Sequence, residues 1–194
     1  MDHADHVALI RDGVAAGTWA DLGSGNGAFT LALADLLGPG APIHSVDRDG
    51  AALHRQRQAM DRSFPETRVT YHQGDFTRPR SLGLPSLDGL VMANSLHFVR
   101  RKEPLLEVLA QHLVPGGRIV LVEYDSDHGN SWVPHPLSFG SWEGLAATCG
   151  LEGTRLLARR PSRFLGAMYS ALSFRAGHAS RLRPPGSTPG DLSA

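Results

Sequence analysis

One stretch decides the fold of this chain: Trp19-Ala20-Asp21-Leu22-Gly23-Ser24-Gly25-Asn26-Gly27-Ala28-Phe29-Thr30. The apolar residues that end at Leu22 predict a buried strand, and the segment 29–37 predicts a helix. Between them stand three glycines in five positions, where a Cβ would block both left-handed backbone conformations and the close approach of a ligand. A strand, a glycine turn and a helix N-terminus in this order predict a site at which the backbone contacts a ligand.

Two kinds of nucleotide cofactor bind at such a turn. Gly23, Gly25 and Ala28 have the spacing of the dinucleotide pattern G-x-G-x-x-G/A. Asp21 argues against a dinucleotide, because its carboxylate would lie near a pyrophosphate, and like charges about 4 Å apart cost roughly 4 kcal/mol at an effective dielectric of 20. The same carboxylate would attract a ligand with an ammonium and a sulfonium, such as S-adenosylmethionine. A tight turn that binds no ligand is the plain alternative.

The segment ADLGSGNGAFT resembles the first motif of the class I S-adenosylmethionine-dependent methyltransferases. Four later segments resemble further motifs of that family, in the expected order. They are VDRD at 46–49, GDF at 74–76, MANSLHF at 92–98 and LVPGGRIVLVE at 113–123. The resemblance implies a single-domain, Rossmann-like α/β fold with a seven-stranded, mostly parallel sheet, helices on both faces and a late antiparallel strand.

Apolar and alternating patterns place the expected elements. We expect strands at 18–22, 43–46, 69–73, 87–93, 118–123, 151–158 and 164–174. We expect helices at 2–16, 27–37, 50–63, 100–112 and 137–149, and a turn at 115–117. The methyltransferase domain is expected over 1–175, and a disordered tail over 176–194, where Gly, Pro, Ser and Arg dominate.

The composition excludes several classes of protein. Of the 194 residues, 41% are hydrophobic and 20% charged, and 19 basic side chains balance 19 acidic ones, so no basic field indicates nucleic-acid binding. Cys149 is the only cysteine, which excludes an intrachain disulfide and a cysteine-based zinc site. No apolar run reaches the roughly 18 residues of a membrane span, and the N-terminus lacks a secretory signal pattern. We expect a cytoplasmic protein with no nucleic-acid or membrane partner, and a homodimer is left open.

The cofactor expected is S-adenosyl-L-methionine, with S-adenosyl-L-homocysteine as the product. Asp47 follows a strand, and ligands lie at the carboxyl ends of parallel strands, so its carboxylate is placed to accept both ribose hydroxyls. The resemblance implies that Asp75 accepts the adenine amino group and that Phe76 packs beside the ring; for both carboxylates, a solvated loop residue is the alternative. The expected cofactor contacts are Asp21, Gly23, Ser24, Gly25, Asn26, Gly27, Asp47, Arg48, Asp75, Phe76, Asn94 and Ser95.

The expected activity is methyl transfer to an oxygen, nitrogen, sulfur or carbon atom of a small molecule. The N-methyltransferases of DNA and of glutamine carry an Asn/Asp-Pro-Pro-aromatic signature where this chain has Asn-Ser-Leu-His at 94–97, which argues against amide-nitrogen acceptors. His97 and Tyr124 are candidate catalytic residues, and His97 is either a general base or a helix-start residue without a chemical role. A methyltransferase of protein or RNA, and a non-catalytic relative that acts through a partner, are the alternatives.

The segment 124–136 is a long polar loop on the side of the sheet where the acceptor is expected. Trp132 and His135 in it are candidate walls of the acceptor pocket, while packing of Trp132 on the sheet edge or at a dimer contact is the alternative. His128 and His135 near Asp125 and Asp127 match no compact metal-ligand spacing, so no metal site is expected.

Overall fold

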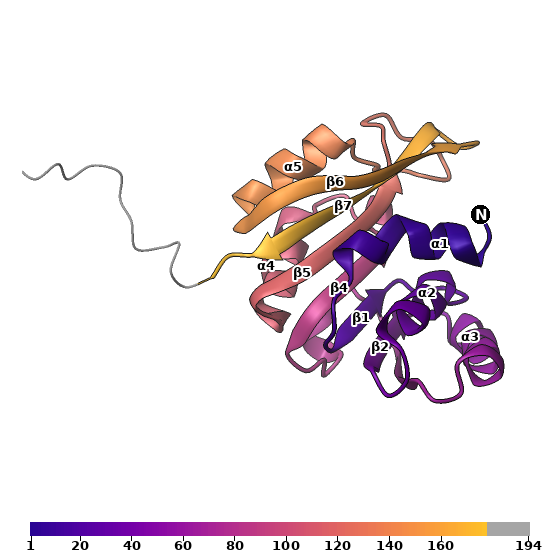
Figure 1. Cartoon of the computed structure of the whole chain (residues 1–194). Coiled ribbons are helices and arrows are strands. Elements are labelled where there is room, and N and C mark those ends of the chain that lie inside the picture. Colours follow the sequence, from indigo (N-terminus) through magenta and orange to yellow (C-terminus); the bar gives the residue numbers. More distant parts are fainter. Residues whose placement is uncertain (178–194) are drawn as a thin grey trace, which may run out of the picture.

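Seven strands form one sheet in the order β3-β2-β1-β4-β5-β7-β6 in the computed structural model, which describes residues 1–177 (Figure 1). The pairings among β1 to β5 are parallel, and β7 is antiparallel to both of its neighbours. The strands are β1 (Trp19–Leu22), β2 (Pro42–Asp47), β3 (Arg68–Gln73), β4 (Leu87–Ala93), β5 (Leu113–Tyr124), β6 (Leu151–Ser162) and β7 (Gly166–Arg175). The predicted mostly parallel sheet with one late antiparallel strand is confirmed.

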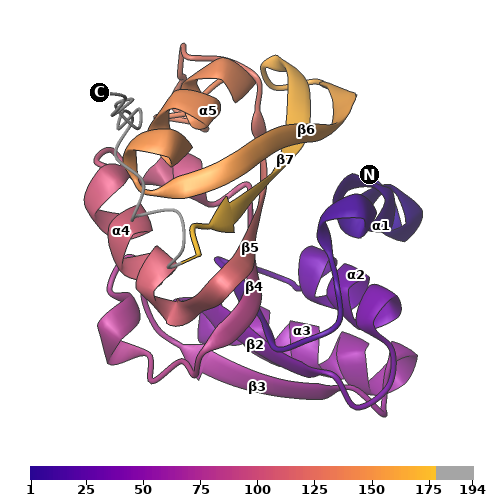
Figure 2. The same ribbon diagram turned by 60° about the vertical axis from the view of Figure 1, so that its left-hand side comes forward.

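Helices cover both faces of this sheet, as predicted. Figure 2 shows α1, α2 and α3 on one face and α4 and α5 on the other. Their bounds are α1 (His3–Ile10), α2 (Ala28–Leu37), α3 (Gly50–Ser63), α4 (Glu103–His112) and α5 (Phe139–Thr148). Three short 3₁₀ helices join them: η1 (Arg11–Gly13), η2 (Pro79–Ser81) and η3 (Leu96–Phe98).

The central strands are apolar on both faces because both faces are covered. In β5, Ile119 and Leu121 belong to the core on the α4 and α5 side. Val120 and Val122, which alternate with them, belong to the core on the side of α1, α2 and α3. This alternation fixes the direction in which each side chain at the end of β5 points.

Several boundaries differ from the sequence prediction. The helix predicted over 2–16 ends at Ile10, and a 3₁₀ turn follows it. The predicted turn at 115–117 lies inside β5, where the pairing of β4 with β5 shifts in register and the extra residues form a bulge. The helix predicted from Arg100 begins at Glu103, after Lys102 as its N-cap residue. The helix predicted from Leu137 begins at Phe139, because the Ser138 side chain accepts a hydrogen bond from the Ser141 N–H and caps it.

The order of the strands places a crevice at the carboxyl ends of β1 and β4. From β1 the chain moves outward to β2 and β3 and then returns to β4 on the other side of β1. Ligands of open α/β sheets bind outside the strand ends at such a switch point. The segments 23–27, 47–49, 74–77 and 94–99 leave the strands at this edge.

Two further expectations concern the rest of the chain. None of the helices within residues 1–177 combines the length and apolar character needed to cross a lipid bilayer. The predicted tail at 176–194 lies almost wholly outside the described residues and stays a prediction.

Candidate functional site

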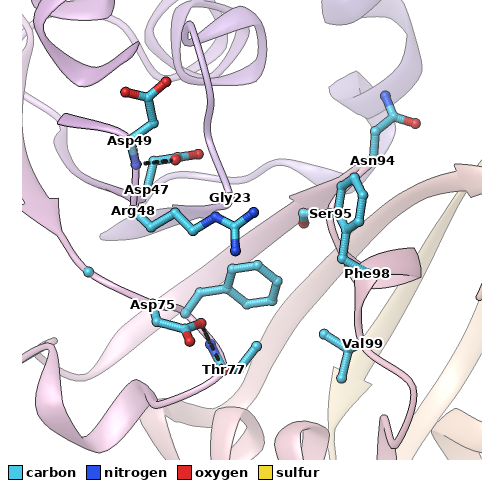
Figure 3. Close-up of a pocket in the computed structure, with 12 residues that line it drawn as sticks. Gly23, Asp47, Arg48, Asp49, Asp75, Thr77, Asn94, Ser95, Phe98 and Val99 are labelled. Carbon is cyan, nitrogen blue, oxygen red and sulfur yellow. Dashed lines mark hydrogen bonds between the residues drawn. The ribbon is translucent and has the colours of Figure 1, made fainter. Parts of the chain in front are cut away.

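A cavity of about 380 Å³ lies at the carboxyl ends of the parallel strands (Figure 3). Acidic residues and Arg48 line one side of it, and Asn94, Ser95, Phe98 and Val99 line the other. The volume is within the range of small-molecule sites. The lining residues are Gly23, Asp47, Arg48, Asp49, Gly74, Asp75, Phe76, Thr77, Asn94, Ser95, Phe98 and Val99.

The glycine turn after β1 packs closely against the segment after β4. Gly23 has a φ of +77°, and a Cβ there would lie 2.5 Å from the Cβ of Ser95. The hydroxyl of Ser95 donates a hydrogen bond to the Leu22 carbonyl at 2.7 Å, which holds the two segments together. Gly25 has a φ of +53° but open space beside it. The turn therefore needs glycine at 23 for packing and at 25 for backbone conformation.

A buried polar network supports the turn from below, and sequence reasoning missed it. The Gln56 side chain is fully buried in α3, and its Oε1 accepts hydrogen bonds from the hydroxyls of Ser24 at 3.2 Å and Ser45 at 3.1 Å. A Cβ on Gly27 would lie 2.3 Å from Gln56 Cγ, so the third glycine makes room for this side chain. A glutamine among the polar residues of a surface helix carries no sequence signal of burial.

Asp47 ends β2 and points its carboxylate at the cavity edge. Oδ2 accepts a hydrogen bond from the Gly25 N–H at 2.7 Å, and Oδ1 accepts one from the Asp49 N–H at 2.8 Å. A carboxylate offers about four lone-pair positions, so each oxygen keeps capacity for one further donor. The two backbone contacts hold the carboxylate in one orientation, which suits a pair of hydroxyl donors.

Asp75 follows β3 on the same side of the cavity. Its Oδ1 accepts hydrogen bonds from the Thr77 hydroxyl at 2.7 Å and the Thr77 N–H at 2.9 Å. The bond from the Thr77 side chain is the main reason that the pKa of Asp75 is lowered. Oδ2 has no hydrogen-bond partner within residues 1–177, so it can accept a donor from a ligand.

Asp21 is buried beneath the site and does not line the cavity. Only 1% of its surface is exposed, and its Oδ2 accepts a 2.6 Å hydrogen bond from the Thr30 hydroxyl. Burial raises the pKa of Asp21 to about 7, with a smaller upward contribution from the negative charge of Asp47. A cation bound above the turn would favour the ionised form of this carboxylate.

Asn94 is the one non-glycine residue with positive φ among the described residues, at 52°. Its N–H donates a hydrogen bond to the Val122 carbonyl at 2.9 Å, and its side-chain Oδ1 is buried without a partner. A left-handed conformation outside glycine and an unpaired buried polar atom concentrate at functional sites. Asn94 also lines the cavity.

His97 is buried and is paired with a carboxylate that sequence reasoning missed. Nδ1 of His97 lies 2.9 Å from Oε1 and 3.0 Å from Oε2 of Glu123. The same carboxylate accepts the backbone N–H groups of His97 and Tyr124, each at 3.0 Å. Because an ionised carboxylate only accepts, Nδ1 carries the proton, and Nε2 keeps the lone pair in the neutral ring. Glu123 ends an apolar strand, where a fully buried glutamate is a signal of function.

The loop after β5 takes a different position from the one its predicted role requires. Trp132 is 76% exposed, and neither Trp132 nor His135 lines the cavity. The His135 N–H donates to the His97 carbonyl at 3.0 Å, so the backbone of this loop does contact the segment after β4. The assignment of both side chains to the acceptor pocket stays a prediction that the cavity does not support.

The cavity brings together seven of the twelve predicted cofactor contacts. These are Gly23, Asp47, Arg48, Asp75, Phe76, Asn94 and Ser95. The other five, Asp21, Ser24, Gly25, Asn26 and Gly27, lie in β1 or the glycine turn outside the lining. No three His, Cys, Asp or Glu side chains within residues 1–177 are grouped as metal ligands would be.

The polar groups of this site fit S-adenosylmethionine. The carboxylates of Asp47 and Asp75 have free acceptor positions for hydroxyl and amino groups. The open space at Gly25 admits a ligand close to the backbone.

Comparisons with known proteins agree with this assignment. A family model described as a methyltransferase domain matches residues 20–119, more than half of the chain. The release factor glutamine methyltransferase of Synechocystis sp. is 39% identical over 75 residues, which cover 39% of this chain and 24% of that relative. This chain thus spans about a quarter of the length of the curated relative that it matches.

Solved structures share the fold at low sequence identity. The CurJ carbon methyltransferase superposes with a TM-score of 0.66 at 20% identity, over 84% of this chain and 49% of that chain. An arsenic(III) S-adenosylmethionine methyltransferase from Chlamydomonas reinhardtii gives a TM-score of 0.68 at 18% identity, over 91% of this chain and 65% of that chain. With the family match and this shared fold, the chain belongs to the class I, Rossmann-like S-adenosylmethionine-dependent methyltransferases.

Proposed function

We propose that this chain binds S-adenosylmethionine in the cavity and transfers its methyl group to a small-molecule acceptor. The observation that carries the proposal is the pair of oriented carboxylates, Asp47 and Asp75, at the ends of neighbouring strands beside a glycine turn. A glycine turn followed by a ribose-binding carboxylate would also suit a dinucleotide, whereas Asp21 beneath the turn disfavours a pyrophosphate and favours a ligand with cationic groups.

Different residues of the cavity would contact different parts of the cofactor. Asp47 would accept the ribose hydroxyls with its two free lone pairs, and Asp75 Oδ2 would accept the adenine amino group. Asn94 and Ser95 would border the methionine part of the cofactor, at the end of the cavity next to His97. When bound, the cofactor supplies a methyl group on a sulfonium, which is activated for attack by a nucleophile.

The protein's own contribution is to align the acceptor, exclude water and hold a proton. His97 Nε2 is the base in this proposal, because Glu123 holds the opposite nitrogen and fixes the ring. Correct alignment of two reactants removes much of the entropic barrier of a bimolecular step. Neutral acceptors that lose a proton on methylation would use His97, and acceptors that attack as anions would not.

A small-molecule acceptor is favoured over an amide of a protein. The relative from Synechocystis sp. is a release factor glutamine methyltransferase, but the match covers a quarter of it. This chain has Ser95, Leu96 and His97 where the amide-nitrogen enzymes carry Pro-Pro-aromatic, and its His97 ring is committed to Glu123.

Titration calorimetry with S-adenosylhomocysteine tests the cofactor site. We expect Asp47→Ala to weaken binding roughly tenfold or more, which corresponds to about 1.4 kcal/mol. Asp61→Ala, which removes an exposed carboxylate of α3 outside the cavity lining, is the control and should bind as the wild type does. If a folded Asp47→Ala protein bound S-adenosylhomocysteine with unchanged affinity, the assignment of this cavity to the cofactor would be wrong. Formation of S-adenosylhomocysteine in the presence of candidate acceptors then tests the transfer itself.

A further inference from the structure

We propose that the acceptor is a small planar aromatic compound with a phenolic hydroxyl, bound along a strip of rings that continues from the cofactor cavity. The inference rests on the proposed function, because it assigns the acceptor of that same site. The aromatic strip consists of Phe98, His97, Tyr124 and Phe164. The sequence predicts no role in the site for Phe98 or Phe164, and the structure brings both rings to this edge of the sheet.

Ring contacts connect the four members in a row. The ring centroids of Phe98 and His97 lie 4.2 Å apart, those of His97 and Tyr124 lie 5.7 Å apart, and those of Tyr124 and Phe164 lie 6.2 Å apart. The second and third distances are in the range of contacting aromatic pairs, and the first, between neighbours in the sequence, is slightly shorter. The strip is therefore continuous from the segment after β4 to the turn between β6 and β7.

The topology explains why residues so far apart in sequence meet here. Tyr124 at the end of β5 pairs with Met168 of β7, which in turn pairs with Arg160 of β6. The turn that contains Phe164 follows directly, so it lies at the carboxyl end of β5. Phe98 reaches the same edge from η3, the segment that follows β4.

Two rings of the strip are exposed beside the cofactor cavity. Phe98 and Phe164 are each 62% exposed, while His97 between them is buried. Phe98 also lines the cofactor cavity, where Figure 3 shows its ring beside Asn94 and Ser95. Exposed aromatic side chains that adjoin a cavity form a surface on which a flat ring can stack.

The size of the exposed rings and the chemistry of His97 indicate which kind of acceptor the strip can bind. Only two of its rings are exposed, which is enough surface for a small molecule and far too little for a protein interface. The strip itself contains His97, whose Nε2 has no hydrogen-bond partner within residues 1–177 while Nδ1 is held by Glu123. A phenol is acidic enough to give its proton to an imidazole, whereas an aliphatic alcohol is far less acidic.

Every atom, proton and electron pair is accounted for in methyl transfer to a phenol. The phenol O–H bond breaks, and its proton passes to Nε2 of His97. The oxygen electron pair forms a bond to the methyl carbon as the sulfur–carbon bond breaks, and the electron pair of that bond stays on the sulfur. The products are a methyl ether and a thioether, and the imidazolium returns its proton to solvent.

The test measures acceptor binding and turnover with the same ligands. Substituted phenols and the matching cyclohexanols are titrated into the complex with S-adenosylhomocysteine, with saturation-transfer NMR as the readout, and are then assayed for methyl transfer. We expect phenols to bind about fivefold or more tightly than cyclohexanols and to be methylated preferentially. Equal binding of the two series, or no binding of any phenol to a protein that does bind S-adenosylhomocysteine, would overturn the inference. Failure to bind S-adenosylhomocysteine at all would instead refute the proposed function.

Three single-residue variants test which surface binds the acceptor. Phe164→Ala should raise the KM for the best phenol about fivefold or more and leave the affinity for S-adenosylhomocysteine unchanged, because Phe164 lies outside the cofactor cavity. Leu156→Ala, an exposed apolar residue of β6 outside the strip, is the matched control and should change neither value. Trp132→Ala separates two surfaces: a larger effect there than at Phe164 would place the acceptor on the loop after β5 and contradict the aromatic strip.

Discussion

Nδ1 of His97 lies 2.9 Å from Oε1 of Glu123, and both side chains are buried. The carboxylate also accepts two backbone N–H groups, from His97 and Tyr124, which hold it in one orientation. The ring of His97 therefore has one tautomer in its neutral state, with the lone pair on Nε2. Hydrogen bonding of one ring nitrogen determines what the other can do.

Glu123→Gln tests whether this pair acts in catalysis. The amide can donate to Nδ1 of His97, which would move the ring proton to Nε2 and remove the base without removing the ring. We expect kcat on a neutral acceptor to fall roughly 100-fold, as in His97→Ala, because general-base catalysis contributes roughly 100- to 10,000-fold. The measurement is the pH–rate profile of wild type and both variants.

A structural role for the pair predicts a different result. In that case Glu123→Gln would lower the melting temperature but keep the wild-type kcat and the limb of the profile in the range where histidine titrates. Glu143→Gln, which changes a carboxylate on the exposed surface of α5, is the control. A Glu123→Gln enzyme within about twofold of the wild-type kcat contradicts the base assignment.

Lys102 anchors the loop after β5, and its removal should loosen that loop. Its ammonium donates hydrogen bonds to the Val99 carbonyl at 2.8 Å and to the His135 carbonyl at 2.7 Å. Lys102→Met would leave both carbonyls without this partner, at a cost of about 1–3 kcal/mol. We expect a lower melting temperature and faster chymotryptic cleavage at the exposed Trp132.

Arg101→Met is the matched control for Lys102, since Arg101 is its exposed neighbour. That variant should be cleaved at the wild-type rate. Lys102→Arg is informative in addition, because a planar guanidinium does not reproduce the compact geometry of an ammonium between two carbonyls. Equal cleavage of Lys102→Met and wild type would show that the loop is held by other contacts.

The sequence predicted the parts of the site that depend on local pattern. The glycine turn and the two carboxylates that end or follow the second and third strands, Asp47 and Asp75, each depend on a few adjacent residues, and the structure has them at those positions. The strands and helices of the sheet were predicted within a few residues for the same reason.

The parts that sequence reasoning missed depend on contacts between distant segments. Glu123 meets His97 across 26 positions, Gln56 meets Ser24 across 32, and Phe164 meets Tyr124 only because β6 and β7 form a hairpin beside β5. Trp132 was predicted to close the site because a large exposed aromatic is unusual, yet the loop turns its ring to solvent. Side-chain direction in a long loop has no periodic pattern from which it could be predicted.

A pair of histidines at the edge of the sheet predicts how stability depends on pH. Nδ1 of His44 in β2 lies 3.0 Å from Nε2 of His72 in β3. Burial lowers the pKa of both histidines from the ordinary 6.5, and the neighbouring His72 lowers the pKa of His44 further. The folded protein thus takes up these protons at a lower pH than the unfolded chain does. The associated stability is present above about pH 6.5 and is lost as the pH falls through the folded-state pKa values.

His44→Gln isolates this contribution. Glutamine can still form a hydrogen bond with His72 but cannot become charged. We expect the fall in melting temperature between about pH 7.5 and pH 5.5 to be smaller in His44→Gln than in wild type. His54→Gln on α3 is the control, and its melting curve should follow the wild type. An identical pH dependence in His44→Gln would show that the pair does not titrate in this range.

Asp21 is expected to lower stability and to favour cofactor binding at the same time. Burial raises its pKa from 3.8 to about 7. The folded state therefore holds a proton that the unfolded chain has released, and stability falls as the pH rises from about 4 to 7. The shift corresponds to roughly 4 kcal/mol at most. Asp21→Asn keeps an acceptor for the Thr30 hydroxyl and removes the charge, so the free protein should melt at a higher temperature at pH 8 than the wild type, with little difference at pH 4.

The same substitution should weaken the cofactor, because the charge beneath the glycine turn favours a ligand with an ammonium and a sulfonium. We expect Asp21→Asn to bind S-adenosylmethionine roughly tenfold less tightly, about 1.4 kcal/mol. Thr30→Val is the matched variant. It keeps the carboxylate but removes its 2.6 Å hydrogen bond, which raises the pKa of Asp21 further, so this protein should lose stability at pH 8. If Asp21→Asn binds the cofactor as tightly as the wild type does, the buried carboxylate has no role in cofactor binding.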